Sequence, residues 1–156
     1  AACRQLGELA AFDLDYVEQP LPPGSERDLS RLRDVPVSIA LDESLRDESM
    51  VMRALEADWA DYFILKPTVL GGFARTREVT ERVRAHGKRY VLTTALAGAT
   101  ERRACFDLAC LLPAPLPACG LNTAGFVDGD GESDGLCVSE GRMVPREIEA
   151  HERAAL

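Results

Sequence analysis

Short apolar runs alternate with amphipathic stretches along the 156 residues of this chain. The clearest runs cover residues 14–17, 37–41, 62–65 and 90–92, and a weaker fifth run ends at Leu121. Each run is short and continuous and is rich in β-branched or aromatic residues, which is typical of strands buried on both faces. The pattern therefore predicts about five buried strands.

The segments between these runs predict helices, because apolar residues recur there at helical spacing. Ser25 followed by Asp28 resembles a capping pair at the start of the first helix. His86 and Gly87 are expected to close the third helix, since glycine is common just after a helix C-terminus. The positions expected to face the core are Leu29 and Leu32 in the first helix, Val51, Ala54 and Leu55 in the second, Val79 and Val83 in the third, and Ala104, Leu108 and Leu111 in the fourth.

Strands that alternate with helices at this rhythm indicate βαβ units and a parallel sheet. Right-handed crossovers between parallel strands give either an open doubly wound sheet or a closed (β/α)₈ barrel, and periodicity alone leaves both open. A complete barrel needs about 250 residues, so a barrel here would be the second half of one. Because Ala1 falls within the pattern of a helix, we expect the chain to be a piece of a longer protein.

An ionisable residue follows each of the first three strands at the same phase of the repeat. Glu18, Asp42 and Lys66 follow one another at intervals of 24 residues. In a parallel barrel such positions gather on the C-terminal rim, where active sites lie. Each residue alone could form a structural ion pair, but three in phase indicate a functional site. Carboxylates are ligands that Mg²⁺ prefers, and a lysine beside them can act as an acid or base if its pKa is depressed.

The charge balance narrows the range of partners. The chain has 26 acidic and 18 basic residues and a net charge of −8, so nucleic acid and anionic membranes are not expected partners. An acidic protein can still bind a small carboxylate substrate through a metal cation. No apolar run reaches the roughly 18 residues that a membrane-spanning helix needs. The five cysteines show no Cys-x-x-Cys spacing, which favours a reducing, cytoplasmic setting.

Several motifs resemble those of the enolase superfamily, and most of all those of its o-succinylbenzoate synthase branch. They are Val-Glu-Gln-Pro at 17–20, Leu-Asp-Glu-Ser at 41–44, Leu-Lys-Pro at 65–67 and Val-Leu-Gly-Gly at 69–72. Residues 119–123 and 136–145 also resemble the last barrel strand and the ending of this family. The resemblance implies an α/β fold that is the C-terminal portion, with about five βα units, of a TIM-type (β/α) barrel.

The resemblance divides the chain into two parts. Residues 1–124 would form a partial (β/α) barrel that carries the strand-end residues, and residues 125–156 would form an acidic loop and a tail that returns towards a missing capping domain. The family's Lys-x-Lys strand with the principal base has no counterpart in the chain, and neither have its first metal-ligand Asp and its capping domain. The missing N-terminal half of the barrel is thus an expected partner, and the isolated chain is expected to be inactive.

The resemblance also implies roles for single residues. Glu18 and Asp42 would be the second and third Mg²⁺ ligands. Lys66 would lie across the site from the principal base, where it stabilises an enolate in the synthase branch and acts as an acid and base in the racemase and epimerase branches. Glu43 would support the ligands or merely cap the following helix. Residues at the ends of the later strands would line the substrate pocket or simply pack there: Thr93, Thr94, Gly120 and Leu121.

The implied function is a Mg²⁺-dependent lyase that dehydrates a cyclohexadiene carboxylate to o-succinylbenzoate in menaquinone biosynthesis, through a metal-stabilised enediolate. Two alternatives stay open. One is a dipeptide epimerase or N-acylamino acid racemase on the same scaffold, although the sequence Leu-Lys-Pro at 65–67 favours the synthase. The other is a non-catalytic half-barrel that pairs with a partner half or forms a homo-oligomer, since an open half-barrel exposes apolar sheet edges.

Overall fold

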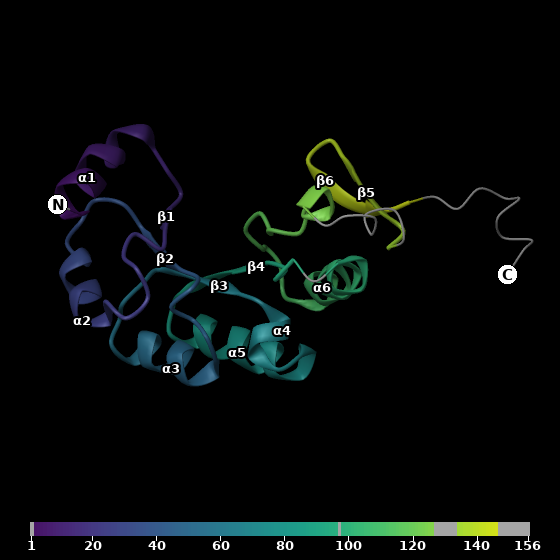
Figure 1. Ribbon diagram of the computed structural model, residues 1–156, viewed down its shortest axis with the longest axis horizontal. Coiled ribbons are helices and arrows are strands. Elements are labelled where there is room, and N and C mark those ends of the chain that lie inside the picture. The colour runs from purple at the N-terminus through teal and green to yellow at the C-terminus, as the bar shows by residue number, and fades with distance from the viewer. Residues whose placement is uncertain (1, 97, 127–133, 147–156) are drawn as a thin grey trace, which may run out of the picture.

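The computed structural model describes residues 2–96, 98–126 and 134–146. Parts of the predicted acidic loop and tail, at 127–133 and 147–156, lie outside the described residues. The elements, shown in Figure 1, are α1 (Ala2–Leu9), the 3₁₀ helix η1 (Ala10–Phe12), β1 (Val17–Glu18), α2 (Glu26–Leu29), η2 (Ser30–Leu32), β2 (Ile39–Leu41), α3 (Glu48–Glu56), β3 (Tyr62–Leu65), α4 (Pro67–Leu70), α5 (Phe73–Ala85), β4 (Arg89–Leu92), α6 (Ala99–Leu111), η3 (Ala124–Phe126), β5 (Leu136–Ser139) and β6 (Arg142–Pro145).

Strands β1 to β4 form one parallel sheet in which each strand pairs with the next along the chain. Leu41 pairs with Phe63, and Leu65 pairs with Leu92. Figure 1 shows the helices following an arc around the outside of these strands. A doubly wound sheet would carry helices on both faces, so the sequential order with helices on one side is that of a (β/α) barrel. The predicted portion of a TIM-type barrel is confirmed.

The predicted fifth strand is reduced to a single bridge. Gly120 pairs in parallel with Thr93 and extends the sheet by one residue. Prolines precede it at positions 113, 115 and 117, and proline has no N–H with which to bond a neighbouring strand. In the described residues between α6 and β5, the run therefore touches the sheet at one point without forming an extended strand.

The two faces of the sheet carry two separate apolar clusters. On the side of the helices, Leu41 and Phe63 belong to a large buried cluster together with Val51 of α3. On the opposite side, Tyr62 and Ile64 belong to a smaller cluster. Successive side chains of a strand point to opposite faces, and all residues of β3 are buried. This burial on both faces agrees with the short continuous runs in the sequence.

Most predicted core positions of the helices are buried, but two details of the prediction are wrong. Leu111 is 78% exposed, because α6 turns the face that carries Cys105 and Leu108 towards the core. The Ser25 side chain makes no capping hydrogen bond. The first turn of α2 is instead closed by the backbone, where the N–H of Asp28 donates to the Ser25 carbonyl at 2.9 Å.

Local capping signals determine where the other helices begin and end. At the start of α3, the side chain of Asp47 accepts a hydrogen bond from the N–H of Met50 at 2.9 Å. Proline is favoured at the first position of a helix, and Pro67 begins α4 immediately after Lys66. Gly87 follows α5 with a φ of 70°, a left-handed conformation that glycine adopts without strain. The predicted closure of this helix is confirmed.

The antiparallel hairpin of β5 and β6 is attached to α6 by a buried ion pair. Arg102 of α6 binds Asp134, and their side chains are 5% and 0% exposed. Asp134 also accepts a hydrogen bond at 2.9 Å from the N–H of Leu136, the first residue of β5. All five cysteines are free. Among the described residues, no helix has both the length and the apolar character needed to cross a bilayer.

Candidate active site

Three ionisable residues end neighbouring strands at the carboxyl edge of the sheet. Glu18 is the last residue of β1, Asp42 follows β2 directly, and Lys66 follows β3 directly. Glu18 pairs with Ala40, and Ala40 pairs with Tyr62. Because side chains alternate along a strand, this register places all three ionisable groups on the face that carries Tyr62, opposite the helices. In a complete barrel this face is the interior.

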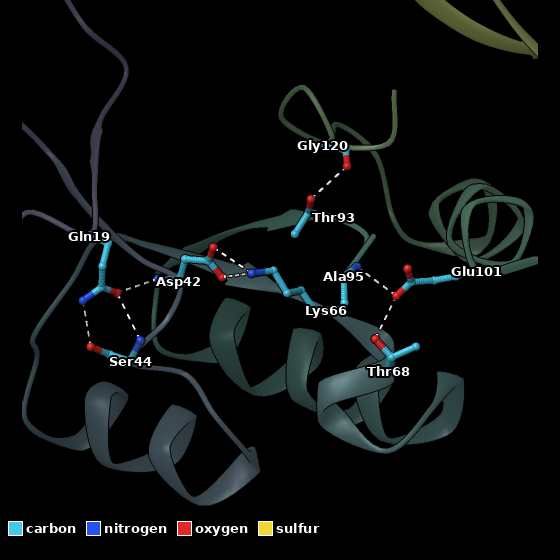
Figure 2. A network of polar contacts seen from close by, with 9 residues as sticks. All are labelled: Gln19, Asp42, Ser44, Lys66, Thr68, Thr93, Ala95, Glu101 and Gly120. Carbon is cyan, nitrogen blue, oxygen red and sulfur yellow. Dashed lines mark hydrogen bonds and ion pairs between the residues drawn. The ribbon is translucent and has the colours of Figure 1, made fainter. Parts of the chain in front are cut away.

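The ammonium group of Lys66 binds both carboxylate oxygens of Asp42 (Figure 2). The Nζ atom lies 2.5 Å from Oδ1 and 2.7 Å from Oδ2. The two side chains are only 24% and 10% exposed. The pair is thus partly shielded from water. Opposite charges attract more strongly in such a shielded place than on an open surface. The structure therefore brings two of the three predicted site residues into direct contact.

Glu18 adds a further negative charge at this edge. Its pKa is raised above the ordinary range, first because the surrounding protein costs the carboxylate hydration, and then because Asp42 and Glu43 are negatively charged neighbours. The charge of Lys66 lowers this pKa by a smaller amount. By surface area Glu18 is an exposed residue, so the hydration cost comes from atoms beside its carboxylate. A bound cation would relieve the repulsion between these neighbouring carboxylates.

Gln19 connects the end of β1 to the loop after β2, as Figure 2 shows. Its Oε1 atom accepts hydrogen bonds from the N–H groups of Asp42 at 3.0 Å and Ser44 at 3.1 Å. Its Nε2 atom donates to the Leu21 carbonyl at 2.6 Å and to the Ser44 hydroxyl at 2.8 Å. Gln19 has a φ of 40°, which is uncommon for a residue other than glycine. The bonds to Asp42 and Ser44 hold the start of the loop after β2 in place.

A cavity of about 190 Å³ lies beside the ion pair of Asp42 and Lys66. Its lining also includes Glu43 and Arg46, which lie in the loop after β2. The rest of the lining is apolar: Leu45, Ile64, Val69 and Leu70. A small cavity with mixed charged and apolar walls suits a small carboxylate that has an apolar part. Arg46 was not predicted from the sequence, where its only signal is its place two residues after the Leu-Asp-Glu-Ser motif.

Of the four residues expected near the end of the last strands, Thr93 and Thr94 contact Gly120, and Leu121 packs in the core. The Thr93 hydroxyl donates to the Gly120 carbonyl at 2.8 Å (Figure 2). Gly120 lies so close to Thr93 that a Cβ atom there would be 2.5 Å from the threonine Oγ1. Thr94 is buried, and its hydroxyl lies 2.9 Å from that of Thr123. The side chain of Leu121 is buried in the large apolar cluster. Glycine at 120 is thus required for the close approach of this segment to β4.

The donors present suit part of a Mg²⁺ site. Glu18 and Asp42 offer hard carboxylate oxygens, and the raised pKa of Glu18 reflects a local excess of negative charge. In the part of the chain that the structure describes, no three His, Cys, Asp or Glu side chains converge closely enough to hold a metal ion. Lys66 engages both oxygens of Asp42, so a cation that binds Asp42 must share these oxygens with the ammonium group or displace it.

Replacing Glu18 with Gln is expected to stabilise the metal-free chain at neutral pH. When folding raises the pKa of a carboxyl group, its ionisation lowers the free energy of unfolding as the pH rises through that pKa. Thermal melting should therefore give a higher Tm for Glu18→Gln than for wild type at neutral pH. Well below the ordinary pKa of 4.5 the two chains should melt alike, because both then carry a neutral side chain.

The matched control for this prediction is Glu78→Gln, which removes the same charge from an exposed position of α5. Its Tm should stay close to that of wild type at both pH values. A rise in Tm of the same size in both variants would show that the gain comes from total charge. That result would contradict a local repulsion between Glu18, Asp42 and Glu43.

Comparison with known proteins identifies sequence relatives along nearly the whole chain. The profile of the family described as Enolase C-terminal domain-like matches residues 1–148. The o-succinylbenzoate synthase of Thermobifida fusca is 33% identical over 152 residues, which cover 97% of this chain and 47% of that protein. The o-succinylbenzoate synthase of Thermosynechococcus vestitus is 38% identical over 96 residues, which cover 61% of this chain and 30% of that protein. The chain thus spans half or less of the length of these relatives.

Solved structures share the fold. The L-Ala-D/L-Glu epimerase from Bacillus subtilis superposes with a TM-score of 0.81 and covers 92% of this chain and 41% of its own. Its sequence identity to this chain is 17%, so the likeness concerns the arrangement of strands and helices. The described sheet and its outer helices thus correspond to part of a larger fold.

Proposed function

The chain belongs to the enolase C-terminal domain-like family, and from that premise we propose that it is the C-terminal part of a Mg²⁺-dependent o-succinylbenzoate synthase. The observation that carries the proposal is the contact of Lys66 with Asp42 at the carboxyl edge of the sheet, with Glu18 on the neighbouring strand. The match to the synthase of Thermobifida fusca along 97% of the chain supports the same reaction.

Glu18 and Asp42 are the residues that would hold the metal ion. A bound Mg²⁺ supplies positive charge that stabilises the negative charge developing on a substrate carboxylate when the adjacent proton is removed. The protein's own contribution is to keep two carboxylates on neighbouring strands, with Gln19 holding the backbone at Asp42. Glu43 adds negative charge next to Glu18 and strengthens the attraction for a cation.

Lys66 would supply a fixed positive charge on the substrate side of the site. Its ammonium group is held by Asp42 and lines the cavity beside it. A preorganised cation lowers the energy of an enolate anion without rearranging at the moment of reaction. In the proposed reaction the substrate loses a proton and a hydroxyl group as water, and an aromatic ring remains. A base outside this chain removes the proton, and Lys66 stabilises the anion that results.

The remaining parts of the site are proposed to come from the other half of the enzyme. These parts are a Lys-x-Lys strand with the principal base, an Asp that completes the metal ligands, and a capping domain over the substrate. Residues 1–124 would supply the barrel portion, and the tail in residues 125–156 would return towards the cap. The isolated chain is therefore expected to bind Mg²⁺ weakly and to lack synthase activity. Cytoplasmic location and a place in menaquinone biosynthesis belong to the same proposal.

Removing the lysine should tighten Mg²⁺ binding to this chain. In Lys66→Met the ammonium group no longer competes for the two oxygens of Asp42, and the local negative charge is no longer offset. We expect the Kd for Mg²⁺ to fall by about tenfold, which equals about 1.4 kcal/mol. Isothermal titration calorimetry of the chain at neutral pH and low salt measures this change.

Lys88→Met is the control for the titration. Lys66 and Lys88 are the two lysines of the chain, so both variants lose one positive charge. Lys88 is 15% exposed and pairs with Asp58 and Asp61, away from the carboxyl edge. Its replacement should leave the Kd close to that of wild type. If both variants bind Mg²⁺ equally tightly, or if Glu18→Gln binds as well as wild type, the proposed ligands are wrong.

A further inference from the structure

Glu101 is a buried carboxylate that joins the loops after two barrel strands. It lies in the first turn of α6, and its residue is only 8% exposed. Its Oε1 atom accepts a hydrogen bond from the Thr68 hydroxyl at 2.8 Å and another from the N–H of Ala95 at 2.9 Å. Figure 2 shows this carboxylate group between the two partners. Glu101 thus joins two segments that are far apart in sequence.

Both partners lie three residues beyond the end of a strand at the carboxyl edge. Thr68 is in α4, two residues after Lys66. Ala95 is two residues after Thr93, whose N–H donates to the Leu65 carbonyl at 3.0 Å. One carboxylate oxygen therefore fixes the segment that follows Lys66 against the segment that follows β4. These two segments form one side of the candidate site.

Gln19 holds the other side of the site in a comparable way. Its side chain bonds the backbone at Asp42 and Ser44, and so fixes the loop after β2 relative to β1. Lys66 lies between the two anchors, with its ammonium group on Asp42. The direction of a long, flexible side chain depends on the backbone from which it starts. Through its bond to Thr68, Glu101 fixes the start of α4, which directly follows Lys66.

We infer that Glu101 is a positioning residue for Lys66, acting through Thr68 and Ala95. The inference rests on the proposed function, since it assigns Glu101 to the same site. Both hydrogen bonds use an oxygen as acceptor, and the Oε1 atom of a glutamine offers the same acceptor without the charge. These two hydrogen bonds therefore depend on the position of the acceptor oxygen and do not require the negative charge. Glu101→Gln should preserve the site, whereas Glu101→Ala leaves the Ala95 N–H and the Thr68 hydroxyl without this acceptor.

The test compares these variants in the enzyme translated from the complete coding sequence. We expect Glu101→Ala to lower kcat by about 10- to 100-fold with KM little changed, because misplacing a supporting group costs rates of this size. Glu101→Gln should restore kcat to within a few-fold of wild type. Equal losses of kcat in the two variants would overturn the inference, because the charge would then matter. An unchanged kcat in Glu101→Ala would overturn it as well.

A second readout does not depend on activity. In the 156-residue chain, reductive ¹³C-methylation labels the N-terminal amine and the two lysines, Lys66 and Lys88, and each labelled amine gives its own NMR signal. Glu101→Ala should shift the Lys66 signal and leave that of Lys88 in place, since Lys88 pairs with Asp58 and Asp61 elsewhere. Should Glu101→Ala fail to fold, Thr68→Val removes one of the two bonds and Thr68→Ser retains it. A Lys66 signal that stays unchanged in the Thr68→Val chain would then reject the inference.

The two readouts separate failure of this inference from failure of the proposed function. A wild-type enzyme without synthase activity would contradict the proposed function, while the Lys66 signal would still decide whether Glu101 positions the lysine. If the wild-type enzyme is active but Glu101→Ala changes neither the Lys66 signal nor kcat, the proposed function is retained and this inference is rejected. That result would reduce Glu101 to a residue that only stabilises the start of α6.

Discussion

Lys66→Met is expected to lower kcat of the complete enzyme by about 10²- to 10⁴-fold, the range observed when an acid, base or charge-stabilising group is removed. The ammonium group of Lys66 lines the cavity beside Asp42, where the negative charge of an enolate would develop. Methionine fills similar space without a charge, so the fold should survive. Ultraviolet absorbance of the aromatic product measures the loss, and circular dichroism checks the fold.

Lys88→Met is again the matched control, because it removes the same charge near Asp58 and Asp61. Its kcat should stay within a few-fold of wild type. A Lys66→Met enzyme that keeps its fold and at least a third of its kcat would show that this lysine has no part in the reaction. The cavity beside Asp42 would then have to serve another purpose.

Arg102→Met is expected to cause a large loss of stability. Arg102 and Asp134 form an ion pair whose side chains are 5% and 0% exposed. Removing one partner leaves a buried charge uncompensated, which costs about 3–5 kcal/mol. Urea denaturation at neutral pH measures the change in the free energy of unfolding. Arg4→Met breaks an exposed ion pair with Glu8 in α1 and should cost about 0.3–0.5 kcal/mol.

The pH dependence of this ion pair has a definite sign. Burial acts to raise the pKa of Asp134, but the hydrogen bonds from Arg102 and from the N–H of Leu136 outweigh it, so the pKa is lowered. A lowered pKa contributes stability at neutral pH that is lost as the pH falls through it. The difference between wild type and Arg102→Met should therefore shrink in acid. A constant difference would show that the arginine acts by packing alone.

The sequence was sufficient to predict the strand-end residues, and the reason is physical. Parallel strands joined by helices repeat at a regular interval, so residues at one phase of the repeat gather at one edge of the sheet. Glu18, Asp42 and Lys66 follow that rule, and their strands could be recognised because both faces of β2 and β3 are buried. The register of β2 and β3 puts Lys66 on the same face as Asp42, and the long lysine side chain reaches the carboxylate.

The supporting residues could not be found in this way. Gln19 bonds the backbone 23 to 25 residues away, and Glu101 bonds Thr68 at a separation of 33 residues. Such bonds depend on which loops the fold brings together, and the hydrophobic pattern of the sequence does not indicate them. The errors have the same origin. Leu111 had the right spacing, but the core lies on the face of α6 that carries Cys105 and Leu108.

The most direct test of the proposed function is a single assay of the enzyme translated from the complete coding sequence. The enzyme is given the cyclohexadiene carboxylate precursor, and formation of o-succinylbenzoate is followed by ultraviolet absorbance before and after a chelator is added. We predict that the aromatic product forms, that the chelator stops its formation, and that Mg²⁺ restores it. Product formation that persists without metal would contradict the roles of Glu18 and Asp42. No product, together with racemisation of N-acylamino acids or dipeptides, would contradict the synthase and assign the site to the epimerase and racemase chemistry.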